Sequence, residues 1–223
     1  IKKIKFAKFN DLKSVAKLVD KKTAMLIVEP IQGERGVLPS DKGFLRGLRE
    51  ITANVGALLA IDAVQTGMGR TGTWFGFENE EIKPDIITLA KGLGGGIPIG
   101  AMIAIGKAGN LFQPGSHGST FGGNPIAAAS ANAVIAEIKK ESYLVGNREK
   151  GEILKKELSK FSGVQSVRGS GLLLGIVLER NNAKEISKNL LTRRILVNAP
   201  SEEVIRIAPA YVVSDQQIAE FIQ

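Results

Sequence analysis

Three short apolar runs in the first half of the chain each end at a charged residue. The runs cover 24–28, 57–61 and 86–90, and the charged residues that follow them are Glu29, Asp62 and Lys91. Amphipathic, helix-like segments separate the runs, which is typical of an α/β fold whose sheet is mostly parallel and buried on both faces. Because open α/β sheets place their ligands at the carboxyl ends of the strands, the three charged side chains predict a binding site there.

The last third of the chain follows a different pattern. Asn124 and Pro125 predict the start of a long, alanine-rich helix that ends near residue 140. After it, short helical and strand-like segments alternate, and Ser214 is positioned to cap a final helix, which indicates a small α+β domain. We expect a boundary near residue 135, with one domain part in 1–135 and a small C-terminal domain in 136–223.

The composition excludes several kinds of site. The chain has no cysteine and a single histidine, His117, so disulfides, cysteine nucleophiles, cysteine metal sites and histidine-cluster metal sites are ruled out. The formal net charge is +8, but the lysines are scattered with few aromatic residues among them, unlike a nucleic-acid surface. No apolar run is long enough for a membrane span or a signal peptide, so we expect a cytoplasmic protein that binds neither membrane nor nucleic acid.

Lys91 and Asp62 are the residues that most strongly indicate chemistry. Lys91 precedes a glycine-rich segment at 92–96 and is either a solvated loop lysine or an amine that forms a Schiff base with a carbonyl. Asp62 is either part of a structural ion pair or the carboxylate that stabilises a protonated pyridine nitrogen. Their places on neighbouring strand ends favour a pyridoxal phosphate site, in which the ring is held at both ends. The glycines do not form a phosphate-binding loop motif.

Four segments, in this order, resemble the motifs of one enzyme family. They are IVEPIQGE at 27–34, IDAVQTGMGRTG at 61–72, TLAKGLGGG at 88–96 and HGSTFGGNP at 117–125. The resemblance is to the class III (omega) aminotransferases of the fold-type-I pyridoxal-phosphate superfamily, and it covers essentially the whole chain. It implies an α/β large domain, represented here by its C-terminal part in 1–135, followed by the small domain. Within the family, residues 68–72, the triple glycine at 94–96 and the glycine pair at 122–123 look most like the acetylornithine aminotransferases of arginine biosynthesis.

The resemblance assigns cofactor roles to residues of these motifs. It implies that Lys91 binds pyridoxal 5'-phosphate covalently and then carries a proton between substrate and cofactor. Asp62 would pair with the ring nitrogen, Val64 would lie against a ring face, and Gln65 would bond the phenolic oxygen. Ser119 and Thr120 resemble the pair that contacts the cofactor phosphate of the neighbouring subunit, which implies a homodimer with shared active sites; the alternative is a plain turn that enters the helix.

The resemblance also suggests how substrates bind. Arg206 matches the arginine that holds a substrate carboxylate, a task that suits a guanidinium. Glu34 matches the glutamate that pairs with this arginine for one substrate and releases it when glutamate or 2-oxoglutarate binds. The reaction implied is transfer of the terminal amino group of N-acetylornithine to 2-oxoglutarate. Another omega-amino donor, such as ornithine, succinyl-diaminopimelate or 4-aminobutyrate, remains an alternative, and for Glu34 and Arg206 taken separately so does a surface ion pair.

Two features depart from the family pattern. Ala63 stands where the family has glutamate, and 209–211 reads Pro-Ala-Tyr where the family has Pro-Pro-Leu. The second change could shift the loop that aims Arg206. The family's phosphate cup, its ring-stacking aromatic residue and its second carboxylate-binding arginine all belong upstream of Ile1, so the chain is expected to lack the N-terminal half. A catalytically incomplete dimerisation domain is therefore the remaining alternative.

Overall fold

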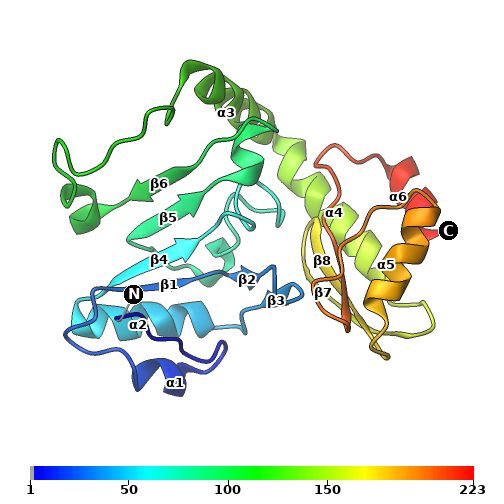
Figure 1. Ribbon diagram of the computed structural model, residues 1–223, viewed down its shortest axis with the longest axis horizontal. Coiled ribbons are helices and arrows are strands. Elements are labelled where there is room, and N and C mark those ends of the chain that lie inside the picture. Colours follow the sequence, from blue (N-terminus) through cyan, green and yellow to red (C-terminus); the bar gives the residue numbers. More distant parts are fainter. Residues whose placement is uncertain (1–2) are drawn as a thin grey trace. The chain divides into compact units, whose positions relative to one another are not determined.

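The computed structural model describes residues 3–223, which fall into two compact units (Figure 1). The first unit contains the described residues up to Pro30, together with Ser40–Gln65 and Phe77–Val134. The second contains Ile31–Pro39, Thr66–Gly76 and Ile135–Gln223. Two segments from early in the sequence therefore pack with the C-terminal part of the chain. No helix within residues 3–223 has both the length and the apolar character needed to cross a bilayer.

A four-stranded sheet forms the centre of the first unit. The strands are β1 (Met25–Val28), β4 (Leu58–Asp62), β5 (Ile86–Leu89) and β6 (Ala101–Ala104), and they lie in the order β1-β4-β5-β6. The β1–β4 and β4–β5 pairs are parallel, and β6 is antiparallel to β5. The predicted α/β architecture with a mostly parallel sheet is confirmed.

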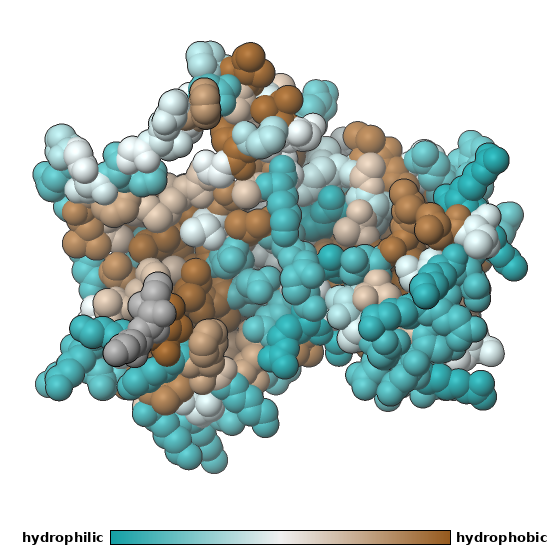
Figure 2. Space-filling view, viewed as in Figure 1, coloured by the Kyte–Doolittle hydropathy of each residue, from teal (hydrophilic) through white to brown (hydrophobic). Residues whose placement is uncertain are grey.

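Burial within this sheet is uneven. β4 is covered, with Leu59 and Ile61 at 0% exposure, whereas Ile27 on β1 is 58% exposed and Met102 on β6 is 48% exposed. The expectation that the first apolar run is buried is therefore wrong. Among the strands that the structure describes, β1 lies at the edge of this sheet, next to β4. Figure 2 shows hydrophobic surface on the first unit.

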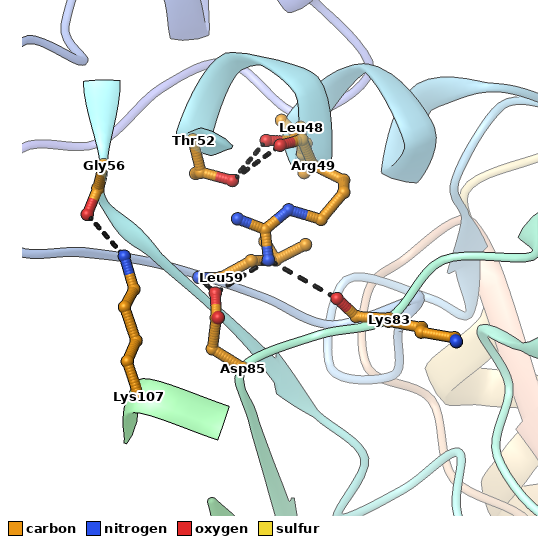
Figure 3. A network of polar contacts seen from close by, with 8 residues as sticks. All are labelled: Leu48, Arg49, Thr52, Gly56, Leu59, Lys83, Asp85 and Lys107. Carbon is orange, nitrogen blue, oxygen red and sulfur yellow. Dashed lines mark hydrogen bonds and ion pairs between the residues drawn. The ribbon is translucent and has the colours of Figure 1, made fainter. Parts of the chain in front are cut away.

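Helix α2 (Phe44–Val55) packs its apolar side, including Leu45 and Leu48, against the sheet. An ion pair ties it to the amino ends of the central strands: Arg49 Nη1 lies 2.7 Å from Asp85 Oδ2, which also accepts from the Leu59 N–H at 2.8 Å (Figure 3). Burial alone would raise the pKa of Asp85, but these two donors and the nearby positive charges outweigh it and lower that pKa. This ion pair lies at the amino ends of the strands, whereas Asp62 lies at the carboxyl end of β4.

Helix α3 (Pro125–Ile138) begins as the sequence predicts. The side chain of Asn124 accepts a hydrogen bond from the Ala127 N–H at 3.0 Å, which is an N-cap, and proline occupies the first helical position. Farther along α3, Ser130 Oγ donates to the carbonyl of Gly94 at 2.8 Å. The helix thereby anchors the glycine-rich turn that follows β5.

The second unit contains an antiparallel sheet of β7 (Val164–Ser170), β8 (Leu173–Leu178) and β9 (Val204–Ile207). One face packs on helices α4 (Glu141–Leu158), α5 (Ala183–Thr192) and α6 (Asp215–Ile222) through a shared apolar core. Ser214 caps α6 in a capping box with Gln217, as its position predicts. The sequence pattern does not predict β7, because its residues are mostly polar or glycine.

The other face of this sheet carries a small hairpin. Strands β2 (Ile31–Gln32) and β3 (Leu38–Pro39) pair with each other, and Ile31 and Val37 form a second apolar cluster with Leu173 of β8. The loop that joins them, 33–37, contains Glu34. The hairpin therefore delivers Glu34 to the sheet that carries Arg206.

Candidate active site

Asp62 is the last residue of β4, and its carboxylate is held by two donors. Oδ1 accepts from the backbone N–H of Val64 at 3.0 Å and from the hydroxyl of Thr88 at 3.2 Å. Thr88 is also the residue opposite Asp62 in the β4–β5 register. One carboxylate oxygen is thus used to orient the side chain, and within residues 3–223 the other oxygen, Oδ2, remains available to accept a hydrogen bond from a ligand.

Lys91 follows β5 at a sharp change of backbone direction. Its φ is +46°, a left-handed conformation that non-glycine residues adopt rarely and that often occurs at functional sites. The residue is exposed and opens a 3₁₀ turn, Lys91–Gly94, in which Leu93 N–H donates to the Ala90 carbonyl at 3.0 Å. The extended chain therefore ends at Lys91, shortly after the last residue of β5.

A pocket of about 720 Å³ adjoins Lys91. Its walls come from the glycine-rich turn and from the segment that precedes α3. They are Ala90, Lys91, Gly96 to Gly100, Phe121 to Asn124 and Ala127. Its volume is within the range of small-molecule sites. Of the residues predicted to bind cofactor, Lys91 lines this pocket, whereas Asp62, Val64, Gln65, Ser119 and Thr120 are not among its walls.

The strand register gives the approximate distance between the backbones of Asp62 and Lys91, which decides whether both side chains can reach one pyridoxal phosphate ring. Neighbouring strands are about 5 Å apart and three extended residues cover about 10 Å, so the two backbones are separated by roughly 11 Å. Side chains on both residues can close much of that gap. An oriented carboxylate and an exposed amine fit the nitrogen and aldehyde ends of pyridoxal phosphate. Val64 and Gln65, partly buried after β4, stand next to Asp62 in the chain.

The segment with Ser119 and Thr120 is exposed throughout. Ser119 Oγ accepts from the N–H of Gly122 at 3.0 Å, which orders the turn before α3. Phe121, beside them, is 81% exposed, and Leu111 and Phe112 are also largely exposed. Such a concentration of exposed apolar side chains is unusual for a surface that faces only water.

Glu34 and Arg206 form an ion pair in the second unit. Arg206 Nη1 lies 2.7 Å from Glu34 Oε1, with the side chain of Arg206 16% exposed and that of Glu34 72% exposed. The structure brings together these two residues, which are far apart in the sequence. A largely buried cation whose partner carboxylate reaches in from the solvent can exchange that partner for another carboxylate.

Tyr211, which belongs to the segment 209–211 that departs from the family pattern, contacts Arg70. The guanidinium carbon of Arg70 lies 4.0 Å from the centroid of the Tyr211 ring, and Arg70 Nη1 donates to the carbonyl of Pro209 at 2.6 Å and to that of Leu172 at 3.2 Å. Arg70 therefore holds the loop after β9 at two points, the backbone carbonyl of Pro209 and the ring of Tyr211.

Comparison with known proteins decides the family. The family model described as Aminotransferase class-III matches residues 2–223. The chain belongs to the class-III aminotransferases. This family depends on pyridoxal phosphate, the cofactor that the sequence predicts, and one matching structure of a class-III relative, the ornithine aminotransferase from Toxoplasma gondii, is described as having partial occupancy of PLP at its active site.

Named relatives of this class-III chain are aminotransferases. The acetylornithine aminotransferases of Corynebacterium efficiens and Streptomyces coelicolor are 44% and 46% identical to it over 99% and 96% of its length. Among solved structures, the N-acetylornithine aminotransferase from Stenotrophomonas maltophilia K279a matches 98% of the chain with a TM-score of 0.89 at 34% identity. The ornithine aminotransferase from Toxoplasma gondii ME49 matches 98% with a TM-score of 0.91 at 30% identity.

The class-III chain is shorter than these relatives. It spans 55% and 54% of the two acetylornithine aminotransferases, and 59% and 54% of the two matching structures. About half of each relative therefore has no counterpart in it.

Two residues that contact the candidate site were not predicted from the sequence. Thr88 holds Asp62, and Phe121 lines the pocket next to Lys91. Thr88 is the one hydroxyl residue in the apolar run 86–90, three positions before Lys91, and that contrast is a signal that could have identified it. Phe121 lies inside the 117–125 motif, in which the family resemblance assigns roles to its neighbours Ser119 and Thr120.

Proposed function

We propose that the intact protein is a pyridoxal-phosphate-dependent aminotransferase that moves the terminal amino group of N-acetylornithine to 2-oxoglutarate, a step of arginine biosynthesis. The observation that carries the proposal is the 44–46% identity to acetylornithine aminotransferases over nearly the whole chain. The arrangement of Asp62, Thr88 and Lys91 supports the same chemistry. In this proposal the chain supplies the C-terminal part of the large domain, to about residue 135, and the small domain.

The proposed roles follow from contacts in the first unit. Pyridoxal phosphate, when bound, supplies a ring that accepts the electrons released at the substrate carbon. Asp62, oriented by Thr88 and the Val64 N–H, would keep the ring nitrogen protonated. Lys91, at the pocket wall, would hold the cofactor's reactive end and carry the proton during transfer. Val64 would lie against the ring and Gln65 would bond its phenolic oxygen.

The second unit supports a mechanism for accepting two unlike substrates. Glu34 would neutralise Arg206 when the bound substrate is the amino donor, because the part of that substrate near Arg206 carries no carboxylate. Glutamate or 2-oxoglutarate would replace Glu34 with its own carboxylate, since an ion pair with one exposed partner opens at low cost. The two half-reactions would then alternate in a ping-pong cycle.

We further propose a cytoplasmic homodimer. Ser119 and Thr120 are in an exposed segment flanked by exposed apolar side chains, which suits a surface that a second copy covers. In that arrangement their hydroxyl groups would reach the phosphate of the neighbouring subunit's cofactor.

Ornithine is the second candidate amino donor, because an ornithine aminotransferase matches the fold with a TM-score of 0.91. Single-turnover kinetics with the cofactor-loaded intact protein test the choice between donors. N-acetylornithine, ornithine, succinyl-diaminopimelate and 4-aminobutyrate are each mixed with the protein, and loss of the cofactor's visible band is followed. The proposal expects the highest kcat/KM for N-acetylornithine. A higher kcat/KM for another donor would identify that donor as the substrate in place of N-acetylornithine. Absence of amino transfer from all four donors would refute the enzyme function.

A further inference from the structure

Two arginines of the second unit lie in one row across its sheet. Arg168 of β7 is opposite Gly175 of β8, and Gly175 is opposite Arg206 of β9. Residues that face each other across antiparallel strands point to the same side of a sheet. The next row, with Val167, Ile176 and Ile205, points to the helix-covered core. Arg168 and Arg206 therefore share the face that carries the β2–β3 hairpin.

Arg168 binds the backbone of the hairpin loop. Its Nε and Nη2 both donate to the carbonyl oxygen of Gly36, at 3.0 and 2.8 Å. Burial lowers the pKa of Arg168, an effect that the nearby Glu203 opposes. Because a cationic donor makes a stronger hydrogen bond than a neutral one, the loop is held firmly at Gly36, two residues after Glu34.

Gly175 lets the loop lie directly on the strand. A Cβ atom at this position would be 2.8 Å from the carbonyl oxygen of Gly36 and 3.0 Å from Cβ of Val37. Val37 itself has φ +55°, a conformation that is strained for a β-branched residue and persists only where surrounding contacts impose it. The loop is thus fixed by close packing as well as by Arg168.

Arg206, at the other end of the row, contacts a side chain of the same loop, that of Glu34. Arg206 holds Glu34 at 2.7 Å, and the two partners differ in exposure, 16% for Arg206 and 72% for Glu34. Glu34 can leave by rotating into solvent, while Gly36 remains bound to Arg168. We propose that Arg168 is a positioning residue that fixes the loop, so that exchange of substrates at Arg206 moves only the side chain of Glu34. This inference rests on the proposed role of the Glu34–Arg206 pair.

The test compares the two half-reactions in the intact, cofactor-loaded protein. Arg168→Met removes both hydrogen bonds to Gly36 and loosens the loop. Glu34 then returns to Arg206 less often when the amino donor lacks a carboxylate there. Loss of a charge-assisted hydrogen bond predicts that kcat/KM for N-acetylornithine falls about tenfold relative to that for glutamate. Arg168→Lys, which keeps the charge, should restore part of this ratio. In a Glu34→Gln background, Arg168→Met should leave the ratio unchanged, because the group that it positions is already absent.

A second measurement reports the loop without needing activity. The Val37 N–H donates to the Gly33 carbonyl at 3.2 Å within the loop, and hydrogen exchange of 33–37 should accelerate in Arg168→Met. Equal losses in both half-reactions, ratio changes that multiply with those of Glu34→Gln, or unchanged exchange in 33–37 would each overturn the positioning role. A wild-type protein inactive with every donor would refute the proposed function instead, and the exchange measurement would still decide whether Arg168 holds the loop.

Discussion

Thr88 donates its hydroxyl hydrogen to Asp62 across the β4–β5 pair, at 3.2 Å. The same carboxylate oxygen accepts the Val64 N–H. The two donors fix the direction of the Asp62 side chain at the carboxyl edge of the sheet. A residue of the neighbouring strand thus orients the carboxylate that is proposed to hold the cofactor ring.

Replacement of Thr88 by valine should weaken cofactor binding. Valine has nearly the shape of threonine but cannot donate to Asp62, and a hydrogen bond to a charged group contributes about 2 kcal/mol, so the Kd for pyridoxal phosphate should rise by more than tenfold. Titration of the cofactor-free protein with pyridoxal phosphate measures this. Thr88→Ser is the matched control and should bind nearly as the wild type does. Equal affinities of the valine and wild-type proteins would show that this contact does not support the site.

Asp62→Asn should affect chemistry more than binding. The amide keeps the shape of the carboxylate but cannot stabilise a positive ring nitrogen, so we expect kcat to fall by about 100-fold or more with cofactor still bound. Stopped-flow kinetics of the amino-donor half-reaction provide the measurement. Turnover close to the wild-type rate would remove Asp62 from the mechanism.

Arg206→Ala should impair the glutamate half-reaction selectively. A carboxylate that loses a guanidinium partner loses about 3 kcal/mol of binding, so we expect kcat/KM for glutamate to fall about 100-fold. The N-acetylornithine half-reaction should change much less, since Glu34 then has no cation to neutralise. Separate single-turnover measurements distinguish the two, and equal losses would argue against the exchange of partners at Arg206.

The Arg49–Asp85 pair should make stability depend on acid. The pKa of Asp85 is lowered in the folded protein, so its charged form stabilises the fold above the ordinary value of 3.8, and this contribution is lost as pH falls through the folded-state pKa. Asp85→Asn should reduce the free energy of unfolding by about 2 kcal/mol at pH 7 and by less at pH 3. Urea denaturation at both pH values measures the difference.

A matched control exists on the same helix. Arg46 and Glu81 are 3.9 Å apart with side chains 57% and 85% exposed, so Glu81→Gln should change stability very little. A pH-independent effect of Asp85→Asn would contradict the electrostatic explanation.

Much of the first unit could be predicted from the sequence, because local signals determine it. The strands at β4 and β5 follow from short apolar runs, and the start of α3 follows from Asn124 and Pro125. The exposure of β1 could not be predicted, since the apolar run 24–28 does not reveal which of its faces is covered.

Long-range contacts explain what the sequence could not predict. The β2–β3 hairpin has only two residues in each strand and is stabilised by packing of Ile31 and Val37 on Leu173, far along the chain. The bond from Arg168 to Gly36 likewise joins residues 132 positions apart. The contact between Arg70 and Tyr211 is of the same kind, and no local pattern around either residue indicates it.

Lys91 and Asp62 are proposed to hold one pyridoxal phosphate ring, and the visible absorption spectrum of the intact protein tests this proposal most directly. The wild-type protein with bound cofactor should absorb in the visible region, and the spectrum should shift with the amino donor. Lys91→Ala should lose the band of lysine-bound cofactor, while Lys107→Ala, at a lysine that bonds the Gly56 carbonyl, should keep it. A Lys91→Ala protein with the wild-type band would contradict the account.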